Sequence, residues 1–293
     1  MQRFAIGIEF CGTRFKGWQT QQAGVRSIQE TIETVLSKIA DEPIIVHGAG
    51  RTDAGVHATN MIAHFDTNAI RPERGWIMGA NSQLHKDIAL QWIQPMGEDF
   101  HARFKACARR YRYVIYNAPR RPALLWGQVT HAHYALDVEK MQRAALKFEG
   151  THNFESFRAA ACQSNQPVRN VKHCRLSQHG AYLILDIQAD GFLHHMVRNI
   201  VGCLLEVGQG FMMLIILMLF LQHRIAKLQV SLHLRTVCIL FKPIILNNFN
   251  YPKPHLDHCG SIYQNKTLLE KINYSVSAVY VYDTPQAFHQ SNA

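Results

Sequence analysis

The sequence changes in character directly after Gly210, and this change limits which part can fold as an ordinary domain. Residues 1–210 mix charged residues, glycines and periodic apolar positions, whereas residues 211–250 contain no aspartate, glutamate or glycine. The apolar run at residues 211–221 has neither the period of a helix nor the alternation of a strand, and it is shorter than the ~20 residues that a membrane-spanning helix needs. We therefore treat the two parts separately and expect residues 211–293 to form an atypical tail that is not native-like.

Residues 1–210 predict an α+β fold. The alternation of apolar residues over positions 3–10 is typical of a strand. Ser27 begins a capping box in front of the first helix, and Asp190 is expected to cap the last one. Further strands are expected at residues 43–47, 61–65, 88–93, 107–116, 168–176 and 182–189, and helices at residues 28–39, from about 72, at 138–148 and at 193–205.

Each half of this part runs strand, helix, strands in a similar order. This order predicts two similar α/β subdomains, residues 1–105 and 106–210, whose strands join in a central, largely antiparallel sheet. A cleft between the two subdomains follows from that arrangement.

The composition points to a basic protein of a reducing compartment. The formal net charge of +10 suggests an acidic partner such as nucleic acid, although a merely soluble basic protein fits the charge equally well. Residues 1–10 are too short and too polar for a signal peptide. Seven scattered cysteines without a C-x-x-C pair, and seventeen histidines without an H-E-x-x-H motif, support neither disulfides nor a metal site. We therefore expect a cytoplasmic protein.

The loop at residues 47–58 is rich in glycine and lies between two expected strands. Glycines let the backbone turn sharply and approach a ligand closely. Such a loop holds Arg51 and Asp53 outward instead of burying them. An ordinary turn with a surface Arg–Asp pair of little energetic consequence is the alternative.

The strand at residues 109–113 alternates arginine and tyrosine. Tyr111 and Tyr113 therefore share one face, and Arg110 and Arg112 share the other. Aromatic rings stack on bases and arginines contact phosphates, whereas a plain aromatic pair in a sheet core is the alternative. Nearby basic residues favour RNA: Arg103, Lys105, Arg109, Arg120 and Arg121.

The expected helix at residues 191–202 is nearly all apolar apart from His194, His195, Arg198 and Asn199. A buried arginine needs a carboxylate partner, because an unpaired charge is costly in an apolar environment. Arg198 either meets such a carboxylate or extends to the surface.

Four segments, in the same order, resemble the bacterial TruA family of tRNA pseudouridine synthases. They are the opening segment at residues 4–22, the loop at residues 50–58, the strand at residues 109–113 and the helix at residues 191–202. The resemblance covers nearly all of residues 1–210. Cys11 stands where the family has an aspartate, so no role is assigned to that position.

The resemblance implies the pseudouridine synthase fold, with an RNA-binding cleft between the subdomains. It implies isomerisation of uridine to pseudouridine at positions 38, 39 and 40 of the tRNA anticodon stem-loop, by a homodimer that needs no metal or cofactor. The residues that it assigns are Asp53, Tyr111 and Arg198 for catalysis and Arg51, Arg110, Arg112 and Tyr113 for substrate binding. In this assignment Tyr111 stacks on the target base, Arg198 pairs with Asp53, and Arg51 holds the RNA with its base turned out.

Three functions remain compatible with these residues. The first is a working synthase, in which the carboxylate of Asp53 attacks the sugar, acts as a base on it, or adds to the ring. The second is a tRNA-binding protein that is impaired in catalysis because the family C-terminus is missing. The third is a hydrolase that uses Asp53 with a histidine such as His57.

The tail is interpreted as a frameshifted version of the family's C-terminus. Codons that encode residues 211–250 can read, one base over, as a polar helix followed by Gly-Val-Ser-Ala-Pro-Pro-Tyr-Gly-Leu-Tyr-Phe-Ile-Gln-Thr-His-Tyr-Pro-Glu-Gln-Phe and then a stop. A lineage-specific extension is the alternative. The tail as it stands is expected to expose its apolar run and to supply no strand, because its apolar residues do not alternate.

Overall fold

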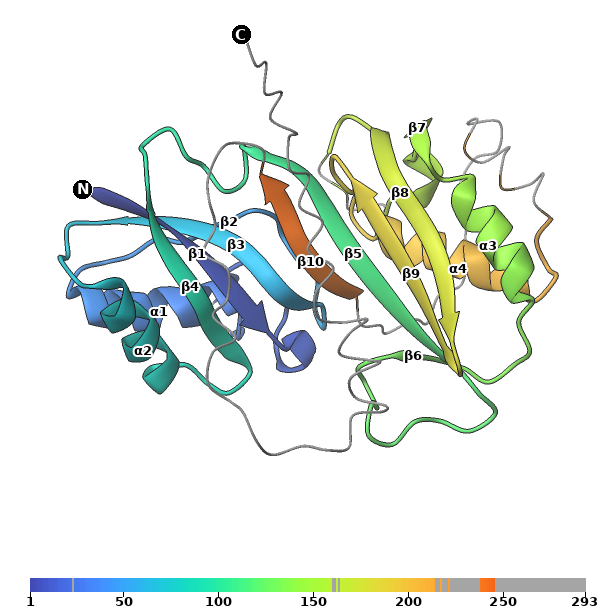
Figure 1. The fold of residues 1–293 in the computed structure, drawn as a ribbon, viewed down its shortest axis with the longest axis horizontal. Coiled ribbons are helices and arrows are strands. Elements are labelled where there is room, and N and C mark those ends of the chain that lie inside the picture. Colours follow the sequence, from blue (N-terminus) through green and yellow to red (C-terminus); the bar gives the residue numbers. More distant parts are fainter. Residues whose placement is uncertain are drawn as a thin grey trace, which may run out of the picture. The chain divides into compact units, whose positions relative to one another are not determined.

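The computed structural model describes residues 1–22, 24–159, 162, 164–213, 217, 221 and 238–245. The chain divides into two compact units, Met1–Asn250 and Tyr251–Ala293, and all described residues belong to the first. In that unit ten strands form one mixed sheet with the order β4-β1-β3-β10-β5-β9-β8-β7, while β2 pairs with β3 and β6 pairs with β5 (Figure 1). The α+β class and the largely antiparallel central sheet are thereby confirmed.

The first half of the sheet is built around β1 (Gln2–Phe10), which is antiparallel to both of its neighbours. Its helices bury their apolar faces against these strands in one hydrophobic core. The hydroxyl of Ser27 accepts a hydrogen bond from the backbone N–H of Glu30, as expected of a helix cap. The remaining elements are η1 (Gly12–Arg14), α1 (Ile28–Ala40), β2 (His47–Gly48), β3 (His57–Thr67), α2 (Glu73–Gln83) and β4 (Ile88–Met96).

The strand expected at residues 43–47 is shorter than predicted. In this segment, pairing with β3 is limited to His47 and Gly48, which form β2. The reason is that the backbone N–H groups of Ile44 and Val46 donate hydrogen bonds to side chains on α1. Ile44 donates to the hydroxyl of Ser37 and Val46 to the carboxylate of Glu33, so neither group takes part in the hydrogen bonds of the sheet.

The second half is built around β5 (Ala106–Asn117), which is antiparallel to β9. A second hydrophobic core lies between these strands and the helices α3 and α4. Asp137 caps α3 by accepting from the backbone N–H of Lys140. The remaining elements are β6 (Thr130–Ala132), α3 (Val138–Leu146), β7 (Gly150–Asn153), η2 (Glu155–Phe157), β8 (Val168–His179), β9 (Tyr182–Ala189) and α4 (Met196–Gly208). The division into subdomains at residues 105 and 106 stays a prediction.

The last helix begins later than the sequence suggests. Asp190 does not cap it, because α4 starts at Met196 with His195 at the cap position in a left-handed conformation, φ 61°. The carboxylate of Asp190 accepts instead from the backbone N–H of Asn170 on β8. Residues 190–195 therefore form an irregular connection and not the first turns of a helix. Within the described ranges, no helix has the length and apolarity to cross a bilayer.

The prediction that the tail supplies no strand was wrong. Residues Cys238–Ile245 form β10, which is parallel to β3 and antiparallel to β5 in the middle of the sheet. Alternation of polar and apolar residues is not required for pairing itself, because the bonds of the ladder join backbone groups alone.

The apolar run after Gly210 is only partly exposed. Met212, Leu217 and Leu221 are buried in the second core, whereas Phe211 and Met213 are exposed. The expectation of a wholly exposed run was therefore wrong for these three residues. Residues 222–237 and 246–293, on which the remaining expectations about the tail fall, lie outside the described part of the chain.

Candidate active site

A cleft of about 1360 Å³ opens between the two halves of the sheet. Most of residues 46–56 line it on one side, residues 190–198 line it on the other, and the start of β5 forms part of its wall. Six basic side chains and two acidic ones line the cleft, so its walls carry a surplus of positive charge. The basic residues are Lys16, Arg51, Arg103, Arg109, Arg169 and Arg198, and the acidic ones are Asp53 and Asp190.

The loop between β2 and β3 presents Asp53 to this cleft. The carbonyl of Thr52 accepts from the backbone N–H of Trp18, and the carbonyl of Asp53 accepts from that of Val56. Gly48 permits the close approach, since a Cβ at this position would lie 2.6 Å from the indole of Trp18. The side chain of Asp53 is left 32% exposed, which is enough for a substrate to reach it.

Arg109, at the start of β5, joins the two walls of the cleft. Its guanidinium donates to the carbonyl of Ala49 at 2.8 Å and to the carbonyl of Asp190 at 3.0 Å. Burial, the largest of several causes, lowers the pKa of Arg109 from its usual high value, and the group remains a cation at neutral pH. One half-buried cation thereby fixes the Asp53 loop relative to the segment before α4.

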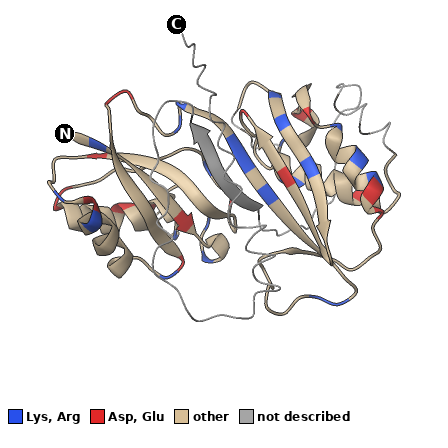
Figure 2. Ribbon diagram, in the orientation of Figure 1, with Lys and Arg blue, Asp and Glu red and all other residues tan. Residues whose placement is uncertain are grey.

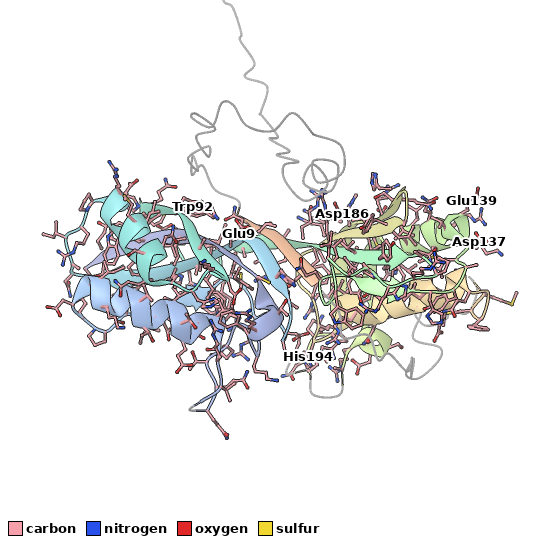
Figure 3. The ribbon with its side chains drawn as sticks, turned by 90° about the horizontal axis from the view of Figure 1, so that it is seen from below. Glu9, Trp92, Asp137, Glu139, Asp186 and His194 are labelled. Atoms are coloured by element: carbon pink, nitrogen blue, oxygen red, sulfur yellow. The ribbon has the colours of Figure 1, made fainter. Side chains whose placement is uncertain are left out.

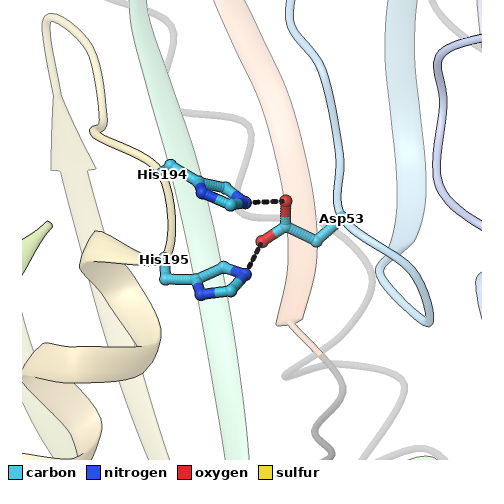
Figure 4. A group of neighbouring side chains, drawn as sticks. All are labelled: Asp53, His194 and His195. Carbon is cyan, nitrogen blue, oxygen red and sulfur yellow. Dashed lines mark ion pairs between the residues drawn. The ribbon is translucent and has the colours of Figure 1, made fainter. Parts of the chain in front are cut away.

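Two adjacent histidines face Asp53 from the opposite wall (Figure 4). The Nε2 atom of His194 lies 3.4 Å from Oδ1 of Asp53, and the Nε2 atom of His195 lies 3.4 Å from Oδ2. The two imidazole rings are themselves in contact, with centroids 3.9 Å apart. The left-handed backbone at His195 brings both rings to the same side of the chain.

Arg198 lies beside these histidines on the same wall of the cleft. Its Nη1 atom lies 3.4 Å from Nε2 of His195, which in turn lies 3.4 Å from Asp53. Burial lowers the pKa of His195; Asp53 raises it, and His194 and Arg198 lower it further. His195 is therefore a neutral imidazole at pH 7, able to donate or accept one hydrogen bond.

Tyr111 lines the cleft beside these groups. It packs against both hydrophobic cores, and its ring meets that of Phe192 edge to face at 4.9 Å. Arg51 also lines the cleft and is exposed. The structure therefore brings together four of the seven predicted residues: Asp53, Tyr111, Arg198 and Arg51.

Arg110 and Arg112 are not among the residues that line this cleft, and their role in substrate binding stays a prediction. Both pair with the carboxylate of Asp186 on β9, at 2.6 and 2.9 Å. Burial raises the pKa of Asp186, but hydrogen bonds from the two arginines lower it more, and the net shift is downward. Figure 3 places Asp186 on the opposite side of the sheet from His194, and Figure 2 shows that β5 and β8 both carry basic residues. These arginines organise the sheet and do not line the cleft.

Tyr113 is also misplaced by the prediction. It shares its face of β5 with Tyr111, as alternation requires, but it is fully buried in the second core. Its hydroxyl is 2.9 Å from the hydroxyl of Thr130 on β6. The face passes from the cleft into the core within two residues, so Tyr113 cannot touch a substrate.

His194, His195 and Arg109 contribute to the site although the sequence pattern assigns them no role there. The two histidines were read as part of a helix, where adjacent residues point about 100° apart and cannot both face one carboxylate. Asp53, His194 and His195 each offer one ligand atom, all within 4.8 Å of one another, and form a group that could hold a metal ion. The histidine that meets Asp53 is thus not the expected His57, which lies at the start of β3.

Comparison with known proteins points the same way as the geometry. Residues 6–105 and 144–229 match the family described as tRNA pseudouridine synthase. The chain is 80% identical over 210 residues to tRNA pseudouridine synthase A of Acinetobacter baumannii (strain ATCC 17978), which covers 72% of this chain and 79% of that relative. The identity is 79% over 210 residues to tRNA pseudouridine synthase A of Acinetobacter baylyi, with shares of 72% and 78%. It is 55% over 208 residues to that of Yersinia pseudotuberculosis, with shares of 71% and 78%.

Proposed function

Because the chain belongs to the tRNA pseudouridine synthase family, we propose that it isomerises uridine to pseudouridine at positions 38, 39 and 40 of the tRNA anticodon stem-loop, with Asp53 as its catalytic residue. The observation that carries the proposal is the position of Asp53. Its carboxylate is accessible at the centre of a cleft whose walls are basic, as a site for a polyanion requires.

The chemistry assigns a task to each side chain near Asp53. The base must detach from C1′ of the ribose, rotate and reattach through carbon, so no atom is gained or lost overall. The carboxylate of Asp53 acts on the sugar or on the ring. Tyr111 offers a flat ring, already held by Phe192, against which the detached uracil stacks. His195 and Arg198 orient the carboxylate from the side of α4.

The target base must leave its stack before it can reach Asp53. Turning a base out of a stem costs a few kcal/mol, which contacts to the phosphates must offset. Arg51 is the side chain best placed for this, because it is exposed, lines the cleft and lies two residues from Asp53.

Three further properties belong to the proposal. The enzyme acts as a homodimer, in the cytoplasm, and its reaction needs no metal or cofactor. Light scattering after size-exclusion chromatography measures the oligomeric state. Activity that is unchanged in excess EDTA is the expected result for a reaction without a metal.

The decisive experiment is release of tritium from tRNA that carries uridine labelled at carbon 5. The wild-type chain is expected to release label, and Asp53→Asn is expected to release none while binding tRNA with similar affinity. Asp41→Asn is the matched control, because Asp41 adopts a left-handed conformation that asparagine tolerates and lies outside the cleft. Appreciable turnover by Asp53→Asn, with activity intact in the control, would refute the assignment.

A further inference from the structure

Three ligand atoms converge on one point in the cleft. The carboxylate oxygens of Asp53 lie 3.4 Å from Nε2 of His194 and 3.4 Å from Nε2 of His195. Two donors that bind Zn²⁺ at ~2.0–2.1 Å with tetrahedral angles are separated by roughly 3.4 Å. Each imidazole therefore lies at about the distance from a carboxylate oxygen that a shared ion requires, and one ligand atom from each of the three residues lies within 4.8 Å of the other two.

The three ligands are held in place before any ion arrives. The Asp53 loop and the segment before α4 are joined by Arg109, through the carbonyls of Ala49 and Asp190. His195 lies directly before the first turn of α4 and is fixed by it. Pre-organised ligands lower the entropy cost of binding. Since the cleft is open, a fourth position is left for water, as in metal sites with three protein ligands.

The identity of the ligands selects the class of ion. Imidazole suits Zn²⁺, Co²⁺ and Ni²⁺, whereas Mg²⁺ and Ca²⁺ prefer sets made of oxygen atoms. Two features limit the affinity. Arg198 places a positive charge near the site, and Nδ1 of His194 is buried without a hydrogen-bond partner among the described residues. Absence of such outer partners costs roughly 10–100-fold in affinity. Because the charge of Arg198 and the use of only three protein ligands weaken binding further, we expect micromolar binding and not the nanomolar binding of structural zinc sites.

We propose that Asp53, His194 and His195 form a site for a divalent transition-metal ion such as Zn²⁺, and that the bound ion inhibits the enzyme. Inhibition, which rests on the proposed function, follows because the ion occupies the carboxylate that must act on the substrate. Substrate and ion exclude each other, so tRNA weakens the binding of Zn²⁺ by the same factor as Zn²⁺ weakens the binding of tRNA.

Binding is measured first, without reference to activity. Isothermal titration of the full chain with zinc chloride is expected to show one micromolar site that is absent, or at least tenfold weaker, in the double variant His194→Gln, His195→Gln. Asp53→Asn, which preserves shape, is expected to weaken the same site and serves if the double variant does not fold. Unchanged affinity in a folded double variant and in Asp53→Asn overturns the proposal.

Other groups in the cleft provide the matched controls. Cys162 lies near the site, because its sulfur accepts from the backbone N–H of His194 at 3.4 Å. His47 and His101 form a second histidine group with buried His64. Cys162→Ser and the pair His47→Gln, His101→Gln are expected to retain the micromolar site. If the zinc site is lost in one of these control variants but retained in His194→Gln, His195→Gln, the ion binds at the residues changed in that control variant, and the proposal is overturned.

The activity arm separates this inference from the proposed function. Micromolar Zn²⁺ is expected to abolish release of tritium by the wild-type chain, and EDTA is expected to restore it. A chain that binds Zn²⁺ at these residues but releases no tritium under any condition contradicts the proposed function and leaves the site standing. A chain that is active, and whose activity is unaffected by Zn²⁺ at concentrations that saturate the site, overturns inhibition.

Discussion

The guanidinium of Arg109 donates at 2.8 Å to the backbone carbonyl of Ala49, 60 positions earlier in the chain. The same side chain donates to the carbonyl of Asp190, so one residue sets the distance between Asp53 and the histidines that face it. Because both acceptors are backbone carbonyls, the contact depends on the shape of the donor and not on the identity of the residues that accept.

Arg109→Lys is expected to impair catalysis more than binding. Lysine keeps the charge but cannot span two carbonyls with a planar fork, so one carbonyl loses its partner. A hydrogen bond to a charged group contributes about 1.5–3 kcal/mol, and we expect a loss of stability of this order. The kcat of tritium release should fall at least tenfold while KM for tRNA changes little. An equal effect on KM, with kcat intact, would mean that Arg109 binds RNA and does not position Asp53.

Salt dependence distinguishes the basic residues of the cleft from those on the other face of the sheet. Arg51→Ala is expected to weaken binding of tRNA and to reduce the slope of log affinity against log salt by about 0.7–0.9, the value for one phosphate contact. Arg110→Ala removes the same charge from the side occupied by Asp186 and should leave the slope unchanged. Filter binding between low and moderate salt measures both. Equal slopes for wild type and Arg51→Ala would show that Arg51 does not contact the phosphates of the RNA.

The locations of Arg110 and Arg112 show where sequence patterns stop being informative. Alternation on β5 predicts correctly that they share a face opposite Tyr111. It does not say which face the helices cover, because that depends on α3 and α4, which pack from later in the chain. Asp53 was singled out because its glycine-rich loop resembles a segment of the family, whereas the residues of the loop alone are equally typical of an ordinary turn.

The paired histidines and β10 were missed for related reasons. The local sequence does not predict the left-handed backbone conformation of His195, because the surrounding structure imposes such a conformation on a residue other than glycine. The apolar periodicity continued through Leu193 and concealed the break before α4. The pairing of β10 with β3 and β5 joins segments more than 100 residues apart, a separation over which periodicity gives no information.

Acid is expected to destabilise the fold through His64. This residue is 2% exposed, and its pKa is lowered to about 4, first by burial and then by His101, His47 and Arg3, while Asp66 raises it. In the unfolded chain His64 binds a proton as the pH falls through 6.5, whereas in the folded chain it binds one only near pH 4. The contribution to stability is therefore fully present above pH 6.5 and is lost as the pH falls toward 4, by an amount of about 3 kcal/mol.

Urea unfolding at pH 7 and at pH 5 measures this loss. His64→Asn is the test variant, because the side-chain oxygen of asparagine can accept from the backbone N–H of Ala102, as Nδ1 of His64 does at 3.2 Å. The variant should be less sensitive to pH than wild type over this range. The same pH dependence in both chains would assign the effect to other groups.

The nucleotide sequence after the Gly210 codon tests the frameshift hypothesis. Under this hypothesis, the alternative frame over residues 238–245 encodes Leu-Tyr-Phe-Ile-Gln-Thr-His-Tyr, a reading that the codons for these residues permit. These are the positions that β10 occupies between β3 and β5. Backbone pairing tolerates either sequence, whereas packing of side chains on the two faces depends on which one is present. We expect the restored chain to unfold at higher temperature than the present one, by several degrees, and to be at least as active. A gene that lacks the Ala-Pro-Pro-Tyr-Gly-Leu-Tyr segment in the alternative frame would show that the hypothesis is wrong.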